Sequence, residues 1–330
     1  MSDSGGLKPA RRGSPLTPKQ RAVAAFEMRA PDDIVPTFEL QFQLADELLG
    51  KRHVSQEELD QAAPSERERL IRQNAALYVE EAEALDYSIV AISLGPGNHE
   101  HLIQTIREIK RLDGEERLIA IMADGTMSIP SGSDMVDVAL RLTEDPDGMH
   151  AGLERSATGT IEAVKPLMEA GADVALMCAD YCFNAGPFLS PRMFREFVTP
   201  YLTRIVAAFR EMGLYAVKHT DGDIMPILDQ LVEANPHALH SLDPMAGVDL
   251  KEIKGLIGDK VALCGNVNCA ILQTGTVEDT IADSKRALRD GMPGGGFFFT
   301  TSNTPFKGMP LENYLAMLQV RKELGRYDRG

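Results

Sequence analysis

Short apolar runs recur eight times along this chain, and each is followed by turn residues and then by sequence with helical periodicity. Strands that alternate with helices favour a parallel sheet, and eight such units are the number that a (β/α)8 barrel requires. A chain of 330 residues, 44% of them hydrophobic, can bury the core of such a barrel within one domain. We therefore predict an α/β fold, a single (β/α)8 TIM barrel over residues 17–330. The predicted strands are residues 34–39, 88–94, 117–123, 173–178, 214–219, 238–242, 260–264 and 296–301.

Two segments lie outside this regular alternation. Thr17 and Pro18 begin an amphipathic helix that reaches about Met28, and we expect it to cap the bottom of the barrel or pack beside it. Residues 1–16 are rich in Gly, Ser and Arg and are expected to be disordered. Residues 40–86 are predicted to form a helical insertion of two or three helices after the first strand, a length typical of a lid. Two further helices, each opened by a proline and followed by a glycine, are predicted over residues 192–212 and 311–324.

Charge and composition exclude several classes of partner. The net charge of −15 disfavours binding to nucleic acid or to anionic membranes, because phosphate groups would be repelled. No apolar stretch approaches the roughly 20 residues of a membrane span, and the first residues lack the apolar core of a signal peptide. The four cysteines follow predicted strand ends and are expected to be reduced thiols. We therefore expect a cytoplasmic protein that acts on a small molecule or a protein partner, with a homodimer as one candidate assembly.

The segment of residues 214–223 is an apolar run that ends in a histidine and two carboxylates. An α/β barrel builds its active site from side chains at the carboxyl ends of its strands. His219 and Asp221 lie two residues apart on a strand, so both side chains point the same way and can reach one metal ion. The alternative is that Asp221 caps the helix beginning near Gly222 and that His219 makes hydrogen bonds in a metal-free pocket.

Polar residues also follow most of the other predicted strands. A single aspartate after a strand is usually a helix cap, but polar residues after nearly every strand indicate a shared site at the barrel mouth. Glu39 and Cys264 are candidates for further metal ligands, although a cysteine at a strand end is more often a core residue. Met245, near the mouth, is expected to fill the core. The candidate substrate-binding residues are Glu39, Asp180, Tyr181, Asn184, Asp243, Asn266 and Ser302.

Six segments, taken in order, resemble the uroporphyrinogen decarboxylase superfamily. They are Pro36-Thr-Phe-Glu39-Leu-Gln-Phe-Gln, Asp180-Tyr-Cys-Phe-Asn-Ala-Gly186-Pro187, Ser190-Pro-Arg-Met-Phe-Arg-Glu-Phe197, His219-Thr-Asp-Gly222, Cys264-Gly265-Asn266 and Asn313-Tyr-Leu-Ala-Met317. The resemblance covers about residues 17 to 325. It implies one of two chemistries: decarboxylation of a tetrapyrrole, or methyl transfer between a small substrate and a corrinoid protein.

The residues at the motif positions favour methyl transfer. A macrocycle with many carboxylates calls for convergent arginines, and the decarboxylases of this family carry them in the loop of the first strand, with an aspartate after the second strand. In this chain the first-strand loop has no arginine. Residues 93–96, Ser-Leu-Gly-Pro, stand where the aspartate is found. The segment at His219 resembles the methyltransferase motif His-x-Cys-Gly-Asn, whose histidine and cysteine bind zinc. Asp221 stands where that cysteine is found, and Ser302-Asn303 stands near the place of a later zinc-binding cysteine. A site of histidine and carboxylates is harder than a thiolate site and suits the polarisation of an oxygen.

The resemblance therefore implies a methyltransferase that uses zinc at His219 and Asp221. Its substrate would be a small methylated compound, such as a methoxylated aromatic, and its acceptor a corrinoid. Because the chain has no Asp-x-His-x-x-Gly cobalamin signature, the corrinoid is expected on a separate protein that docks at the mouth, with residues 40–86 gating it. The alternatives are a uroporphyrinogen decarboxylase-like lyase that acts on a less charged substrate, and a noncatalytic small-molecule-binding barrel.

Overall fold

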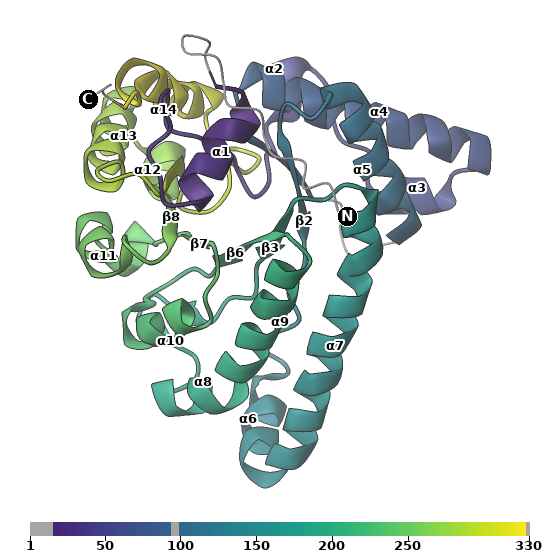
Figure 1. The fold of residues 1–330 in the computed structure, drawn as a ribbon, viewed down its shortest axis with the longest axis vertical. Coiled ribbons are helices and arrows are strands. Elements are labelled where there is room, and N and C mark those ends of the chain that lie inside the picture. Colours follow the sequence, from purple (N-terminus) through teal and green to yellow (C-terminus); the bar gives the residue numbers. More distant parts are fainter. Residues whose placement is uncertain (1–15, 94–98, 328–330) are drawn as a thin grey trace, which may run out of the picture.

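The centre of the molecule is a curled parallel sheet of seven strands, with helices packed outside it (Figure 1). The structure is a computed structural model, and it describes residues 16–93 and 99–327. Residues 1–15, part of the segment expected to be disordered, lie outside these ranges. Residues 94–96, part of the Ser-Leu-Gly-Pro segment after the second predicted strand, also lie outside them. In sheet order the strands are β1 (Ile89–Ile92), β2 (Leu118–Met122), β3 (Val174–Met177), β6 (Tyr215–His219), β7 (Ala238–His240), β8 (Ala262–Val267) and β9 (Phe297–Thr301). A parallel sheet with alternating helices confirms the predicted α/β class.

The first predicted strand, residues 34–39, is not a strand, so the prediction of eight was wrong among the described residues. The segment is extended and makes one hydrogen bond with each edge of the sheet. The Ser88 amide, next to β1, donates to the Thr37 carbonyl over 2.8 Å, and the Phe299 amide of β9 donates to the Pro36 carbonyl over 2.9 Å. Proline has no amide hydrogen to donate, and this prevents a continuous ladder through the segment.

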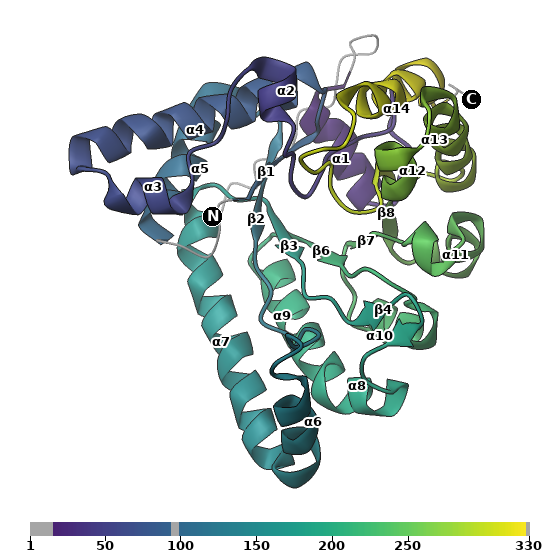
Figure 2. The same cartoon turned by 180° about the vertical axis from the view of Figure 1, so that it is seen from behind.

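The helix α1 (Pro18–Phe26) closes the amino-terminal end of the strands. It begins with a capping box between Thr17 and Gln20, and its buried face joins the apolar cluster inside the curled sheet. The Phe26 ring stacks on Tyr215 at 4.5 Å and packs against Phe298 at 4.6 Å, near the starts of β6 and β9. The helix lies in front of the strands in Figure 1 and behind them in Figure 2. The expectation that it caps the bottom of the barrel is confirmed.

The predicted insertion contains three helices, as expected. They are α2 (Ala45–Leu49), α3 (Gln56–Gln61) and α4 (Pro64–Ala84). The long α4 packs against α5 (His99–Asp113) and β1. The α4 residue Asn74 is buried, accepts the Val54 amide hydrogen at 2.7 Å and donates to the Val54 carbonyl at 2.9 Å. The loop between α2 and α3 is therefore fixed on the long helix.

The remaining helices follow the strands in sequence. The predicted helix over residues 192–212 is two helices, because Pro200 cannot donate the backbone hydrogen bond that would continue the turn. The helices α6 and α7 extend together away from the sheet in both views (Figures 1 and 2). The helices are α6 (Met135–Glu144), α7 (Pro146–Ala170), α8 (Pro191–Phe197), α9 (Thr199–Glu211), α10 (Leu228–Glu233), α11 (Leu250–Ile257), α12 (Cys269–Thr274), α13 (Val277–Gly291) and α14 (Leu311–Leu324).

Three short elements complete the chain. A hairpin of β4 (Cys182–Phe183) and β5 (Gly186–Pro187) follows β3, and the 3-10 turns η1 (Met225–Ile227) and η2 (Pro244–Ala246) follow β6 and β7. All three lie at the carboxyl ends of strands, where the candidate site residues are found. Among the described residues, no helix is long and apolar enough to cross a membrane.

Candidate active site

One histidine and two carboxylates converge at the carboxyl ends of β3 and β6. His219 is the last residue of β6, Asp221 follows it, and Asp180 follows the neighbouring strand β3. The His219 Nε2 atom lies 3.6 Å from Asp180 Oδ1 and 3.7 Å from Asp221 Oδ1. One ligand atom from each residue lies within 4.8 Å of the others, a spacing that one metal ion can bridge. The structure thus brings two of the four predicted metal ligands, His219 and Asp221, together with Asp180, which was predicted to bind substrate.

Backbone contacts explain why the loop after β6 takes this course. Gly222 has a φ of 84°, and a Cβ there would lie 2.5 Å from the Cys182 carbonyl oxygen of the β4–β5 hairpin. The Asp223 amide donates to the Phe183 carbonyl at 3.0 Å, and the Asp221 amide donates to Asp180 Oδ1 at 3.0 Å. Only glycine fits this close approach, so the His-Thr-Asp-Gly sequence locks the β6 loop against the loop that carries Asp180.

The carboxyl group of Asp221 has a raised pKa. Its pKa is raised to about 6, mainly by burial and also by the neighbouring carboxylates of Asp180 and Asp243, against two hydrogen bonds that lower it. Those bonds come from the Ser241 hydroxyl, at 2.7 Å, and from the Asn303 side-chain amide. A cation between the carboxylates would relieve their mutual repulsion, so the charge distribution fits a metal ion.

His219 is buried and uncharged. Burial and the nearby Lys218 ammonium lower its pKa to about 3, so it presents a neutral imidazole, the form that binds metals. Its Nδ1 atom lies 2.9 Å from Nδ1 of His240, whose pKa burial also holds well below the usual range. Our sequence reasoning missed His240. The signal was its place at the end of the neighbouring predicted strand, where β6 and β7 pair His219 with His240 in register.

A buried ion pair braces the strand ends beside the cluster. Lys218 Nζ contacts Asp124 Oδ2 at 2.8 Å and donates to the Ala179 carbonyl at 2.8 Å. Burial alone would raise the pKa of Asp124, but the Lys218 ammonium and hydrogen bonds hold it below the usual range. The ammonium also lies 4.1 Å from the centre of the Tyr181 ring. The pair ties the ends of β2, β3 and β6 together. The sequence signal for this ion pair was Lys218, a charged residue within an apolar run.

Glu39 and Cys264 lie outside the cluster, which corrects their assignment as further metal ligands. Glu39 accepts hydrogen bonds from the Thr301 amide (3.1 Å) and hydroxyl (2.6 Å) and from the Tyr314 hydroxyl (3.3 Å), in the layer between the sheet and α14. Phe38 belongs to the interior cluster, so the next side chain along the extended segment points outward. Burial raises the pKa of Glu39 to about 8. Cys264 is fully buried within the same apolar interior.

Of the predicted substrate-binding residues, Asp180 and Asp243 lie at the cluster. Asp243 accepts the Gly222 amide hydrogen at 3.4 Å and raises the pKa of Asp221. The others serve the fold or lie apart. Tyr181 is buried with its hydroxyl 2.5 Å from the Thr126 hydroxyl, and Asn184 is exposed at the hairpin turn.

Asn266 and Ser302 are both buried, and their side chains make hydrogen bonds that hold neighbouring loops. Asn266 donates to the Leu242 carbonyl at 2.7 Å and accepts from Arg286 of α13 at 2.9 Å. The Ser302 hydroxyl accepts the Cys269 amide hydrogen at 3.3 Å, at the start of α12. Both side chains therefore brace the loops beside the site, and their contact with substrate stays a prediction.

Exposed apolar side chains lie at or after the carboxyl ends of β2, β3 and β7, on the same face of the sheet as the cluster. They are Met122 at the end of β2, Phe183 in the hairpin that packs on Gly222, and Met245 two residues after Asp243, with exposures of 36%, 46% and 55%. The expectation that Met245 fills the core was wrong. Large apolar side chains left in solvent around a polar cluster are typical of a binding surface.

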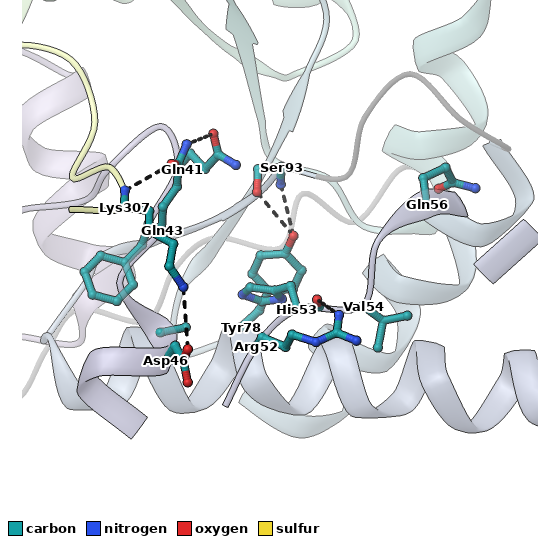
Figure 3. A pocket seen from close by; sticks show the side chains of 12 residues that line it. Gln41, Gln43, Asp46, Arg52, His53, Val54, Gln56, Tyr78, Ser93 and Lys307 are labelled. Carbon is teal, nitrogen blue, oxygen red and sulfur yellow. Dashed lines mark hydrogen bonds and ion pairs between the residues drawn. The ribbon is translucent and has the colours of Figure 1, made fainter. Parts of the chain in front are cut away.

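A separate cavity of about 280 Å³ lies beside the insertion (Figure 3). Its wall includes Tyr78, whose ring packs 4.2 Å from that of His53 and whose hydroxyl accepts the Ser93 amide hydrogen at 3.2 Å. None of the cluster residues lines it. The Gln43 amide donates to the Pro305 carbonyl at 3.0 Å, so the same loop that carries Asn303 also borders this cavity. The remaining lining residues are Gln41, Phe42, Ala45, Asp46, Arg52, Val54, Gln56 and Lys307.

Comparisons with known proteins give a consistent relationship. The sequence model of the family described as uroporphyrinogen decarboxylase (URO-D) matches residues 81–324. The uroporphyrinogen decarboxylase of Coxiella burnetii is 26% identical over 189 residues, which cover 54% of this chain and 48% of that protein. The chain thus spans about half the length of this relative. The corresponding protein of Thioalkalivibrio sulfidiphilus is 26% identical over 242 residues, 68% of this chain and 65% of that one. A methyltransferase from Methanosarcina mazei shares the fold with a TM-score of 0.74 and 20% identity, covering 93% of this chain and 99% of that one.

Proposed function

The chain belongs to the uroporphyrinogen decarboxylase family, as its motifs predicted, and within it we propose that this protein is a methyltransferase acting on a small methylated substrate. The methyl acceptor is a corrinoid carried by a separate protein. The observation that carries the proposal is the cluster of Asp180, His219 and Asp221 at the carboxyl ends of the strands. The fold that this chain shares with a methyltransferase is compatible with it.

The donor set fits zinc. A neutral imidazole and two carboxylates supply three protein ligands, the number found in catalytic zinc sites that keep one position open for a substrate atom. A zinc ion held by these three residues would supply Lewis-acid activation of the heteroatom that carries the methyl group. Oxygen is the favoured heteroatom because the ligands are hard, so the proposed substrate is a methyl ether such as a methoxylated aromatic compound.

The chain's own residues have separate tasks in this proposal. Asp180, Asp221 and His219 hold the metal, and Ser241 and Asn303 orient the Asp221 carboxylate by their hydrogen bonds. The exposed side chains of Met122, Phe183 and Met245 offer an apolar border on which the corrinoid protein docks, which would keep water away from the reduced corrinoid.

A second candidate is a decarboxylase-like lyase, which the names of the curated relatives favour. The contacts of the cluster speak against a polycarboxylate substrate. The cluster itself carries the carboxylates of Asp180 and Asp221, with that of Asp243 beside them, and the buried Lys218 ammonium is paired with Asp124. These negative charges would repel a substrate that carries several carboxylates.

The test combines metal content with a substrate panel. The purified protein is analysed for zinc by mass spectrometry, then incubated with a reduced corrinoid protein and a panel of methoxylated aromatics and methylamines. Corrinoid methylation by a zinc-loaded protein supports the proposal. Release of CO₂ from uroporphyrinogen without corrinoid supports the lyase, and neither reaction in a metal-free protein supports a noncatalytic barrel.

A further inference from the structure

His219 has a second contact, on the side of its ring that faces away from the carboxylates. Its Nδ1 atom lies 2.9 Å from Nδ1 of His240, and both histidines are buried, with 5% and 1% of their surface exposed. Two neutral ring nitrogens at this distance form a hydrogen bond only if one of them carries a proton and the other does not. The contact therefore couples the tautomers of the two histidines.

Thr300 lies beside the other nitrogen of the His240 ring, at a distance longer than that of an ordinary hydrogen bond. Its hydroxyl oxygen lies 3.0 Å from the Thr301 carbonyl oxygen and 3.5 Å from His240 Nε2. A hydroxyl has one proton and a carbonyl only accepts, so the Thr300 hydroxyl donates to Thr301 and offers a lone pair to His240. A lone pair that faces His240 Nε2 favours a proton on that nitrogen, and then His240 Nδ1 accepts and His219 Nδ1 is the donor.

The distances on the carboxylate side agree with this arrangement. His219 Nε2 lies 3.6 Å from Asp180 Oδ1 and 3.7 Å from Asp221 Oδ1, beyond the range of about 2.7–3.2 Å for an N–H···O bond. An Nε2–H group facing two carboxylates would draw closer to one of them. The Asp221 oxygen instead accepts the Ser241 hydroxyl at 2.7 Å. The Nε2 atom therefore presents a lone pair to the cluster.

We propose that His240 is a positioning residue that holds His219 in its Nδ1–H tautomer and aims the Nε2 lone pair between Asp180 and Asp221. His219 Nδ1 donates to His240 Nδ1, His240 Nε2 faces the Thr300 hydroxyl oxygen at 3.5 Å, and that hydroxyl donates to the Thr301 carbonyl. The purpose of this arrangement rests on the proposed metal site, because a lone pair beside two carboxylates is useful only to a cation. The tautomer itself is a property of the metal-free chain and is tested separately.

The first measurement needs no metal. Long-range ¹H–¹⁵N correlation spectra of protein labelled at histidine distinguish the two tautomers, and the His219→Asn variant assigns the signals. We expect His219 in the Nδ1–H form in the metal-free wild type, and a mixture of tautomers in His240→Phe. A wild-type His219 protonated at Nε2 would overturn the proposal.

The second measurement is zinc affinity, by competition with a chromophoric chelator. Loss of a residue that orients a metal-binding histidine typically lowers affinity about 10–100-fold, which is the expected effect of His240→Phe. His240→Asn places an amide oxygen near the position of Nδ1 and should recover most of that loss. His237→Asn is the matched control, since His237 precedes β7 at the opposite end, accepts the Ala216 amide hydrogen and should bind zinc as wild type does.

The outcomes separate this proposal from the metal site itself. If the wild type binds no zinc but His219 is in the Nδ1–H form and loses it in His240→Phe, the positioning role stands and the metal function fails. If His240→Phe binds zinc as tightly as wild type, or His240→Asn is as impaired as His240→Phe, then His240 does not act through an accepting atom and the proposal is wrong.

Discussion

Replacing Glu39 by glutamine should remove a large pH dependence from the stability of this protein. Burial raises the pKa of Glu39 from 4.5 to about 8, so the folded state keeps a proton that the unfolded state releases above pH 4.5. Stability therefore falls as pH rises from 4.5, and the loss levels off above about pH 8. Glutamine keeps the size of the side chain, accepts the Thr301 amide hydrogen and donates to the Thr301 hydroxyl, and it does not titrate.

The size of the effect follows from these two pKa values. Each pKa unit corresponds to about 1.4 kcal/mol, and between pH 6 and pH 9 the titration of Glu39 lowers the free energy of unfolding by about 2.7 kcal/mol. The difference in unfolding free energy between Glu39→Gln and wild type should therefore shift by about this amount, in favour of the variant, over that interval. Comparing the two at each pH cancels the constant cost of the substitution.

Urea titrations at pH 6, 7, 8 and 9, followed by circular dichroism, measure the difference. Glu66→Gln is the control, because the Glu66 carboxylate is exposed, pairs with Arg69 and has a lowered pKa, so it stays ionised across the interval. A difference between Glu39→Gln and wild type that is constant from pH 6 to pH 9 would refute the reasoning that Glu39 is held as a neutral acid.

Further predictions concern the site and its surroundings. His219→Ala should lose bound zinc and methyl transfer while its unfolding curve stays close to wild type, and full zinc occupancy would show that the ligand is wrong. Lys218→Met should lower the free energy of unfolding by about 3–5 kcal/mol in urea titrations, because Asp124 is left buried without its partner, and Asp124→Asn in the same chain should restore much of the loss. Replacing residues 50–62 of the insertion by a short glycine-serine linker should slow transfer to the corrinoid protein in stopped-flow absorbance more than it weakens substrate binding in calorimetry; equal losses would argue against gating. Uroporphyrinogen should neither bind at micromolar concentration nor lose CO₂, and measured turnover would favour the lyase.

The sequence was sufficient to predict seven strands, the amino-terminal helix and the three-helix insertion, because each has a local signal. The apolar runs and the capping box at Thr17 are of this kind. Residues 34–39 carry the same apolar signal, yet Pro36 cannot join a ladder, and whether an extended segment pairs depends on its neighbours.

The candidate site was predictable only in part, for a different reason. His219 and Asp221 stood out because polar residues end an apolar run. The direction of Glu39 depends on which neighbour faces the interior, and the contact of His219 with His240 depends on the register of two strands 21 residues apart in the chain. The spacing of residues along one strand predicts neither the direction of the Glu39 side chain nor the contact between the two histidines.

The plug that α1 forms at the amino-terminal end of the strands has a kinetic consequence for the proposed reaction. The Phe26 ring packs between those of Tyr215 and Phe298, so aromatic side chains fill the bottom of the curled sheet at this point. In the proposed reaction, substrate, product and corrinoid would then all use the carboxyl-terminal face. The methylated compound must therefore enter before the carrier protein docks, and its demethylated remainder must wait until the carrier leaves. Such a compulsory order makes carrier dissociation a step that can limit turnover, and excess free carrier should then inhibit the reaction competitively with respect to the methyl donor.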